Sequence, residues 1–153
     1  VARGLSVIQG DADTDLTSYP DQAFDYVILT QTIQATRNPG EVLRELTRIG
    51  ARVFISFPNF GFWKIRGSLI IKGEMPMTGL LNHAWYDTPN IHLCTLKDFT
   101  MLCSSLGVTI EQAFGRTNGS APKPIDPKSA IANLLTEEAI FLLKANNEDK
   151  NSH

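Results

Sequence analysis

Hydrophobic and polar positions follow two different periods along the chain, and each period predicts one kind of element. Short, nearly continuous apolar runs rich in β-branched and aromatic residues predict strands. These runs occupy residues 5–9, 24–29, 52–57, 108–113 and 139–145. Strands with so few polar positions are typical of a sheet that is covered on both faces. We therefore expect a sheet at the centre of the fold.

A helical period follows the second of these runs. Asn38 can cap a helix, Pro39 suits the first helical position, and Glu41 lies three residues after the cap. Apolar residues then recur on one helical face, at Val42, Leu43, Leu46 and Ile49. Gly50 is a typical helix stop. The pattern predicts an amphipathic helix that ends at this glycine.

A second amphipathic helix is predicted by the capping box that Thr95 and Asp98 form. Its apolar stripe contains Leu96, Phe99, Leu102, Cys103 and Leu106, and Gly107 follows it. Residues 62–72, which end before Gly73, and residues 129–135 predict further helices. The segments 74–92 and 115–127 have no clear period and are rich in turn residues, so we interpret them as loops.

The runs at residues 24–29 and 52–57 are joined through the first predicted helix. Such a strand–helix–strand connection places two parallel strands in one sheet with a right-handed crossover. We interpret residues 1–145 as one α/β domain with a parallel sheet, and residues 146–153 as a polar tail.

Composition and charge narrow the class of protein. The 153 residues fit one domain. Fourteen Lys and Arg against sixteen Asp and Glu give a net charge of −2, which argues against a nucleic-acid partner. No apolar run approaches the ~20 residues of a membrane span. The two cysteines, Cys94 and Cys103, have neither zinc nor redox spacing, which favours free thiols and a cytoplasmic protein.

Polar residues follow the first three predicted strands, at the strand ends where ligands bind in an open α/β sheet. They are Asp11 and Asp13, with Ala12 between them, after the first strand, Thr30, Gln31, Thr32 and Gln34 after the second, and Asn59 after the third. A carboxylate just past a glycine can accept a hydrogen bond from an exocyclic amine or a ribose hydroxyl, which makes Asp11 a binding candidate. The alternative is that Asp11 and Asp13 only form turns.

Several aromatic residues lie outside the strand pattern. They are Phe60, Phe62, Trp63, Trp85 and Tyr86. Aromatic residues away from the core pattern indicate a pocket lid or a protein interface, because Trp and Tyr are enriched there. The alternative is a satellite core under a long loop.

The loop that contains Trp85 also holds the candidates for acid–base chemistry. His92 could act as a general base with Asp87 as its orienting group, and Tyr86 is a third candidate. The alternative is a capping or solvated histidine. His92 and Cys94 could supply two metal ligands, but a closed zinc site needs four, so we predict no metal site.

Two levels of resemblance carry the interpretation further. The residues from Gly10 and Asp11, through 24–29, to the helix start at 39–46 resemble the middle of class I S-adenosylmethionine-dependent methyltransferases. The segments 26–36 (YVILTQTIQAT), 56–61 (SFPNFG) and 85–95 (WYDTPNIHLCT) are similar to the MetW family of methionine biosynthesis proteins. This resemblance runs from Val1 to about residue 113, and more loosely to residue 145.

The resemblance implies a Rossmann-like methyltransferase sheet, mostly parallel with the last strand antiparallel. Asp11 would contact the adenine of S-adenosylmethionine, with Ala12 beside it, and Thr30 and Gln31 would lie near the methionine part. The family is associated with homoserine O-acyltransferase as an accessory protein, and its methyl acceptor is not assigned. Asn59, Phe60, Trp63, Trp85 and Tyr86 would form the partner or substrate surface. A methyltransferase that acts on a small acceptor is the alternative function.

The chain has no glycine-rich cofactor motif of the kind G-x-G-x-x-G. The resemblance implies that the first two strands, the glycine loop and the ribose-binding acid precede Val1. We therefore expect an incomplete class I methyltransferase fold, in which residues 24–29 face a gap and the cofactor is held only by the full-length protein. An exposed strand edge of that kind favours aggregation.

Overall fold

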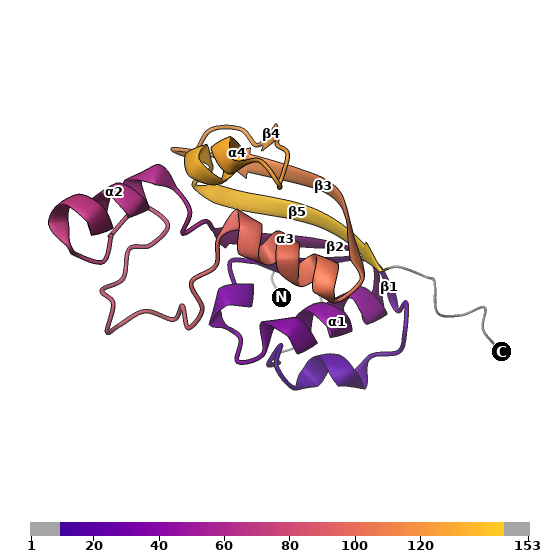
Figure 1. Ribbon diagram of the computed structural model, residues 1–153. Coiled ribbons are helices and arrows are strands. Elements are labelled where there is room, and N and C mark those ends of the chain that lie inside the picture. The colour runs from indigo at the N-terminus through magenta and orange to yellow at the C-terminus, as the bar shows by residue number, and fades with distance from the viewer. Residues whose placement is uncertain (1–9, 146–153) are drawn as a thin grey trace, which may run out of the picture.

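A five-stranded sheet lies at the centre of the computed structural model, which describes residues 10–145 (Figure 1). The strand order is β1-β2-β5-β3-β4. The strands are β1 (Phe24–Thr30), β2 (Gly50–Pro58), β3 (Val108–Arg116), β4 (Lys123–Pro124) and β5 (Glu138–Ala145). Four of the five predicted strands are confirmed, and the predicted strand at residues 5–9 and the polar tail lie outside the described residues.

The pairing of the strands gives a mixed sheet. β1 and β2 are parallel, as the strand–helix–strand connection requires. β5 lies between β2 and β3 and is antiparallel to both, and β4 is antiparallel to β3. β1, β2 and β3 therefore run in the same direction, and the last strand, β5, runs against them, which is the direction that the resemblance implies for the last strand. Because β5 is inserted between β2 and β3, these two strands run in the same direction without pairing with each other.

The helix α1 (Pro39–Ile49) joins β1 to β2, and it forms where the apolar period and the cap predict it. The Asn38 side chain accepts a hydrogen bond from the Glu41 amide at 3.4 Å, which satisfies one free amide of the first turn. The four predicted apolar residues are all buried. The short 3₁₀ turns η1 (Asp15–Ser18) and η2 (Ile33–Ala35) precede this helix.

Gly50 follows the end of α1, as predicted, but it is not a typical helix stop. Its φ of −115° is extended, so the residue does not form a left-handed helix cap. A Cβ atom at this position would lie 2.6 Å from Cγ2 of Val27 and 3.2 Å from the carbonyl oxygen of Leu46. The glycine therefore allows the start of β2 to pass close to β1.

Three further helices follow β2. They are α2 (Trp63–Lys72), α3 (Leu96–Ser105) and α4 (Ala130–Leu135). The predicted capping box of α3 is present in full, and Gly73 ends α2 with a φ of 68°. Segment 74–92 has no helix or strand, as predicted. No helix in the described part of the chain is long and apolar enough to cross a membrane.

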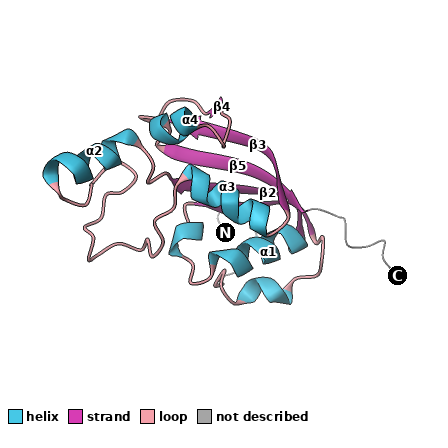
Figure 2. Ribbon diagram, viewed as in Figure 1, coloured by secondary structure: helices cyan, strands magenta, loops and turns pink. Residues whose placement is uncertain are grey.

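The main hydrophobic core lies between the sheet and the two helices α1 and α3, which cover the same face of the sheet (Figure 1). Alternate residues of β2 and β5 point into this core. The ring centroid of Phe57 lies 4.8 Å from that of Phe99 and 5.8 Å from that of Phe141. The chain from α2 to residue 92 extends away from this body (Figure 2) and has its own small core around Phe62.

The face of the sheet opposite α1 and α3 is less covered than the apolar runs predict. Tyr26 and Ile28 of β1 are 58% and 68% exposed, and Tyr26 stacks on Phe54 of β2. Within residues 10–145, β1 is an edge strand that pairs only with β2. The expectation of a sheet covered on both faces therefore does not hold for β1 in the described residues.

Candidate functional site

One edge of the sheet brings together residues from four strands. The parallel strands β1 and β2 end there at Thr30 and Pro58. β5 runs in the opposite direction, so its first residue, Glu138, pairs with Pro58. The last residue of β3, Arg116, pairs with Glu138. This is the carboxyl edge of the parallel strands, where open α/β sheets bind their ligands.

Gln31 lies directly after β1 at this edge and has an unusual backbone. Its φ of 49° lies in the left-handed region, which costs about 1–3 kcal/mol for a residue other than glycine. The Gln31 amide donates a hydrogen bond to the carbonyl oxygen of Ser56 at 2.8 Å. Its side-chain Nε2 donates to Oε1 of Glu138 at 3.1 Å. Such local strain persists where the surroundings fix it, and it is concentrated at functional sites.

Glu138 is the centre of a short polar chain along the edge. Its side chain is 5% exposed, and it accepts hydrogen bonds from Gln31 and from Nε of Arg116. The Arg116 guanidinium also supplies the opposite charge that a buried carboxylate needs. The sequence pattern did not identify Arg116 or Glu138. Arg116 lies near the start of the predicted glycine- and proline-rich loop, and Glu138 precedes the predicted last strand by one residue.

The predicted cofactor residues are at the same edge or near it. Asp11 is exposed, and its Oδ1 accepts a hydrogen bond from the Asp13 amide at 2.9 Å, so the turn alternative describes its local geometry. Oδ2 of Asp11 has no partner among the described residues. Ala12 is half-buried and Thr30 is exposed at the end of β1. A free carboxylate oxygen on an exposed turn fits the proposed contact with an amino group.

Asp13 is a structural residue. Its carboxylate accepts hydrogen bonds from the amides of Arg37 and Asn38 at 3.0 and 3.3 Å, which ties the loop to the start of α1. The neighbouring Asp15 accepts from the Asp11 amide at 2.8 Å. This hydrogen bond, with one from Thr14, lowers the pKa of the Asp15 carboxyl.

Asn59 is fully buried, so the prediction that it belongs to a partner or substrate surface is wrong. Its Nδ2 donates to the carbonyl oxygens of Asn133 and Thr136, both at 2.8 Å. Its Oδ1 accepts from the amides of Gly61 and Leu96 at 2.9 and 3.0 Å. The position of Asn59 after a strand predicted a contact with a ligand or partner. In the structure its side chain instead joins the end of β2 to the start of α3 and to the end of α4.

The predicted aromatic surface divides into two groups. Phe62 is buried with Ile65 and Leu81, and Phe60 packs against them, as the satellite-core alternative expected. Trp63, Trp85 and Tyr86 are 50%, 73% and 77% exposed. Trp85 and Tyr86 contact each other edge to face at 5.7 Å. Three aromatic residues therefore remain available for a partner.

The candidate acid–base group is not assembled as expected. Tyr86, Asp87 and His92 are all exposed. The Asp87 amide donates to the carbonyl oxygen of Ala84, whereas Nε2 of His92 lies 3.4 Å from the carbonyl oxygen of Arg37. Because His92 packs towards the start of α1, Asp87 does not orient its ring in this structure. The capping or solvated alternative describes His92 better.

Cys94 and Cys103 are free, as predicted. Burial raises the pKa of each thiol to about 12. Only the thiolate is a strong nucleophile, so neither residue is suited to covalent catalysis at neutral pH.

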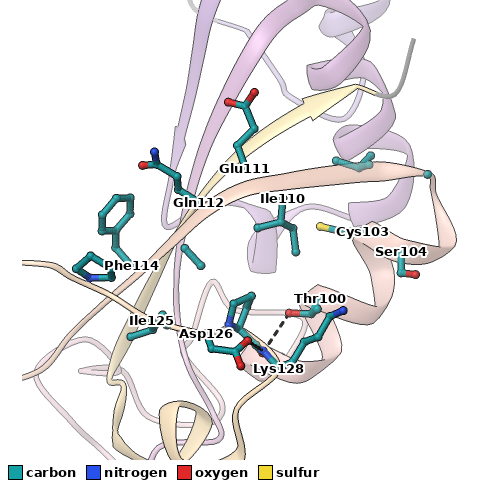
Figure 3. Close-up of a pocket in the computed structure, with 15 residues that line it drawn as sticks. Thr100, Cys103, Ser104, Ile110, Glu111, Gln112, Phe114, Ile125, Asp126 and Lys128 are labelled. Carbon is teal, nitrogen blue, oxygen red and sulfur yellow. Dashed lines mark hydrogen bonds between the residues drawn. The ribbon is translucent and has the colours of Figure 1, made fainter. Parts of the chain in front are cut away.

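A separate cavity lies between α3 and β3 (Figure 3). Its volume is about 870 Å³. Figure 3 shows Ile110, Phe114 and Ile125 along it, with the charged Asp126 and Lys128 on its loop side. Thr100 from α3 donates to the carbonyl oxygen of Pro127 at 3.5 Å. None of the predicted site residues lines this cavity, so it does not belong to the carboxyl edge.

Solved structures of other proteins share this arrangement of helices and strands. A SAM-dependent methyltransferase from Thermotoga maritima has a TM-score of 0.63 at 14% identity, over 95% of this chain and 66% of that protein. A SAM-dependent methyltransferase from Archaeoglobus fulgidus has a TM-score of 0.57 at 15% identity, over 93% of this chain and 68% of that protein. The likeness shows the α/β fold of SAM-dependent methyltransferases.

Sequence comparison gives a narrower result. The bifunctional methionine biosynthesis protein MetXA/MetW of Rhodopirellula baltica is 38% identical over 111 residues, which is 72% of this chain and 18% of that protein. The chain thus spans less than a fifth of this curated relative. The family model described as methionine biosynthesis protein MetW matches residues 1–143. The chain belongs to the MetW family of methionine biosynthesis proteins.

Proposed function

We propose that this chain is the methyltransferase-fold part of an accessory subunit that binds and supports homoserine O-acyltransferase. The observation that carries the proposal is the Rhodopirellula baltica relative, whose name joins MetXA and MetW in one bifunctional protein. Two activities that occur in one chain are often partners when they occur in separate chains. The MetW resemblance implies that the partner is the acyltransferase that activates homoserine.

The surface proposed for this partner is the exposed aromatic group Trp63, Trp85 and Tyr86. It lies on α2 and the following loop, which extend from the body of the protein (Figure 1). Other exposed apolar residues of the same region are Ile70, Ile71, Met77 and Ile91. Large exposed apolar patches on soluble proteins usually mark interaction sites. Exposed tryptophan and tyrosine are also the residue types that most often dominate binding energy at interfaces.

Replacing Trp85 with alanine is expected to weaken binding to the acyltransferase by about 2 kcal/mol or more, because an anchoring aromatic residue loses its buried contact. A titration of the full-length protein with the purified acyltransferase measures this change. Ile131→Ala is the control, since Ile131 is equally exposed but lies on α4. Wild-type binding by both Trp85→Ala and Trp63→Ala would contradict the proposed surface.

A second function is a SAM-dependent methyltransferase that acts on a small acceptor. The observation that favours it is the strained Gln31 at the carboxyl edge, next to Thr30 and the buried Glu138. In this function Asp11 and Ala12 would hold the adenine end of S-adenosylmethionine, and Thr30 and Gln31 would lie near its methionine end. The cofactor would supply the methyl group, while these residues bind and orient it.

Replacing Asp11 with alanine is expected to reduce the affinity for S-adenosylmethionine by about 1.5–3 kcal/mol, which is the contribution of a hydrogen bond to a charged group. Calorimetric titration of the full-length protein measures the affinity. Asp11→Asn retains an acceptor for the Asp13 amide, so it tests the charge without removing the turn. Asp25→Ala is the control, because Asp25 lies at the opposite end of β1. An unchanged affinity in Asp11→Ala would remove this residue from the site.

A further inference from the structure

A pocket of about 580 Å³ lies beside the Gln31–Glu138–Arg116 chain, and neither proposed function assigns a ligand to it. One wall is the face of α2 that carries Lys64, Ser68 and Lys72, which are four residues apart and therefore lie on one side of the helix. The opposite wall contains Arg116 and Glu138 at the carboxyl edge, with Glu137 and Asn118 beside them. The pocket therefore combines three cationic and two carboxylate side chains.

The two carboxylates of the pocket differ in how they are used. Glu138 is buried and already paired with Arg116 and Gln31. Glu137 accepts one hydrogen bond, from the Asn118 amide at 2.8 Å to its Oε2. Its Oε1 has no hydrogen-bond partner among the described residues. Glu137 can therefore accept a hydrogen bond from a cationic group of a ligand.

The cationic groups of the pocket also retain donors. Arg116 donates to Glu138 through Nε, and its terminal guanidinium nitrogens have no partner within residues 10–145. Lys64 makes one long hydrogen bond, at 3.4 Å, to Oδ1 of Asn118. A planar guanidinium with free terminal nitrogens is well suited to a carboxylate. Arg116 and Lys64 can thus receive an anionic group on one side of the pocket.

The backbone around the pocket is held by local contacts. Among the described residues, three that are not glycine have a positive φ, and two of them adjoin the pocket. Asn118, with a φ of 52°, lines the pocket directly, and Gln31 bonds to its Glu138 wall. Asn118 and Gly119 are the central residues of a β-turn in which the Ser120 amide donates to the carbonyl oxygen of Thr117, a conformation that asparagine tolerates. This turn places the Asn118 amide on Glu137. The geometry of the walls is therefore held by specific contacts.

We propose that this pocket binds a small α-amino acid. The ligand's carboxylate lies towards Arg116 and Lys64, and its ammonium group lies towards Glu137. A zwitterion uses both signs of charge that the pocket presents, whereas a multiply charged phosphate would meet the two carboxylates. The pocket lies beside β3 and β5, whereas the Asp11 turn is tied to the start of α1, which follows β1. The bound amino acid therefore lies on the side of the carboxyl edge away from the Asp11 turn. This ligand goes beyond the partner and the cofactor proposed above.

Calorimetric titration of the full-length protein with L-homoserine is the test. A final concentration of about 10 mM detects binding down to a Kd of about 1 mM, which corresponds to about −4.1 kcal/mol. Two analogues each lack one charge of the probe. They are 4-hydroxybutyrate, without the ammonium group, and 3-aminopropan-1-ol, without the carboxylate. We expect L-homoserine to bind and both analogues to bind at least about tenfold more weakly, equivalent to ~1.4 kcal/mol.

Variants locate the site on the protein. Lys64→Gln and Glu137→Gln are each expected to lower the affinity for L-homoserine by about tenfold. Neither side chain is buried, so both variants should fold. Lys97→Gln on α3 is the matched control and should bind like the wild type.

Several results would overturn the proposal. They are no binding of L-homoserine, equal binding of 4-hydroxybutyrate, tighter binding of inorganic phosphate, or affinity unchanged in both pocket variants. Binding of the acyltransferase is measured in a separate titration. A failed test of the amino-acid pocket can therefore be distinguished from a failed test of the accessory function.

Discussion

Replacing Asn59 with alanine is expected to lower the free energy of unfolding by about 3–5 kcal/mol. The side chain is fully buried and makes four hydrogen bonds to backbone groups. Its removal leaves two carbonyl oxygens and two amides in the interior, and each unpaired buried group costs about 1–3 kcal/mol before the structure relaxes. Losses above about 4–5 kcal/mol are exceptional for one substitution, which sets the upper end of the range.

Urea denaturation of the full-length protein measures the Asn59 effect. Asn82→Ala is the matched control, because Asn82 is the same residue type but exposed in the irregular loop. The control should change the stability by no more than about 0.5 kcal/mol. A loss below about 1 kcal/mol in Asn59→Ala would show that the segments around Gly61, Leu96 and Asn133 are not held together by this side chain.

Replacing Phe57 with alanine is expected to cost about 3–5 kcal/mol of stability, the range for a fully buried aromatic residue. Phe57 is completely buried between Phe99 of α3 and Phe141 of β5, so the substitution leaves a cavity in the main core. The same denaturation experiment measures the loss. A value near zero would mean that the core lies elsewhere.

Phe54→Ala is the matched control for Phe57→Ala. Phe54 lies three residues earlier on the same strand, and its side chain points to the opposite face of the sheet. It is half-buried and stacks on the exposed Tyr26. We expect Phe54→Ala to lower the free energy of unfolding by about 1 kcal/mol, because the half-buried ring contributes less buried apolar surface than Phe57. Equal losses in the two variants would contradict the assignment of Phe57 to the covered face.

Local signals in the sequence were sufficient to predict most of the elements. Asn38 and Pro39 start α1, the capping box of Thr95 and Asp98 starts α3, and Gly73 ends α2. These signals work because caps and left-handed stops depend on neighbouring residues of the chain. The resemblance of three short segments identified the family for the same reason, since each segment is continuous in sequence.

Contacts between distant segments could not be predicted in this way. The sequence pattern placed Asn59 on a surface and missed Arg116 and Glu138. Glu138 meets Gln31 across 107 positions of the chain, and Arg116 reaches it only because β5 inserts beside β3. No local period records which strand will lie between two others, so these partners follow from the sheet order alone.

The sequence by itself determined where the helices and most strands of this protein begin and end, and to which family it belongs. The tertiary structure decided which polar residues face a ligand and which are buried. Asp11 and Asn59 both follow predicted strands, yet one is exposed on a turn and the other bonds to four backbone groups. The physical reason is that burial depends on what packs against a residue from remote parts of the chain, whereas helix and strand formation depends mainly on its neighbours in sequence.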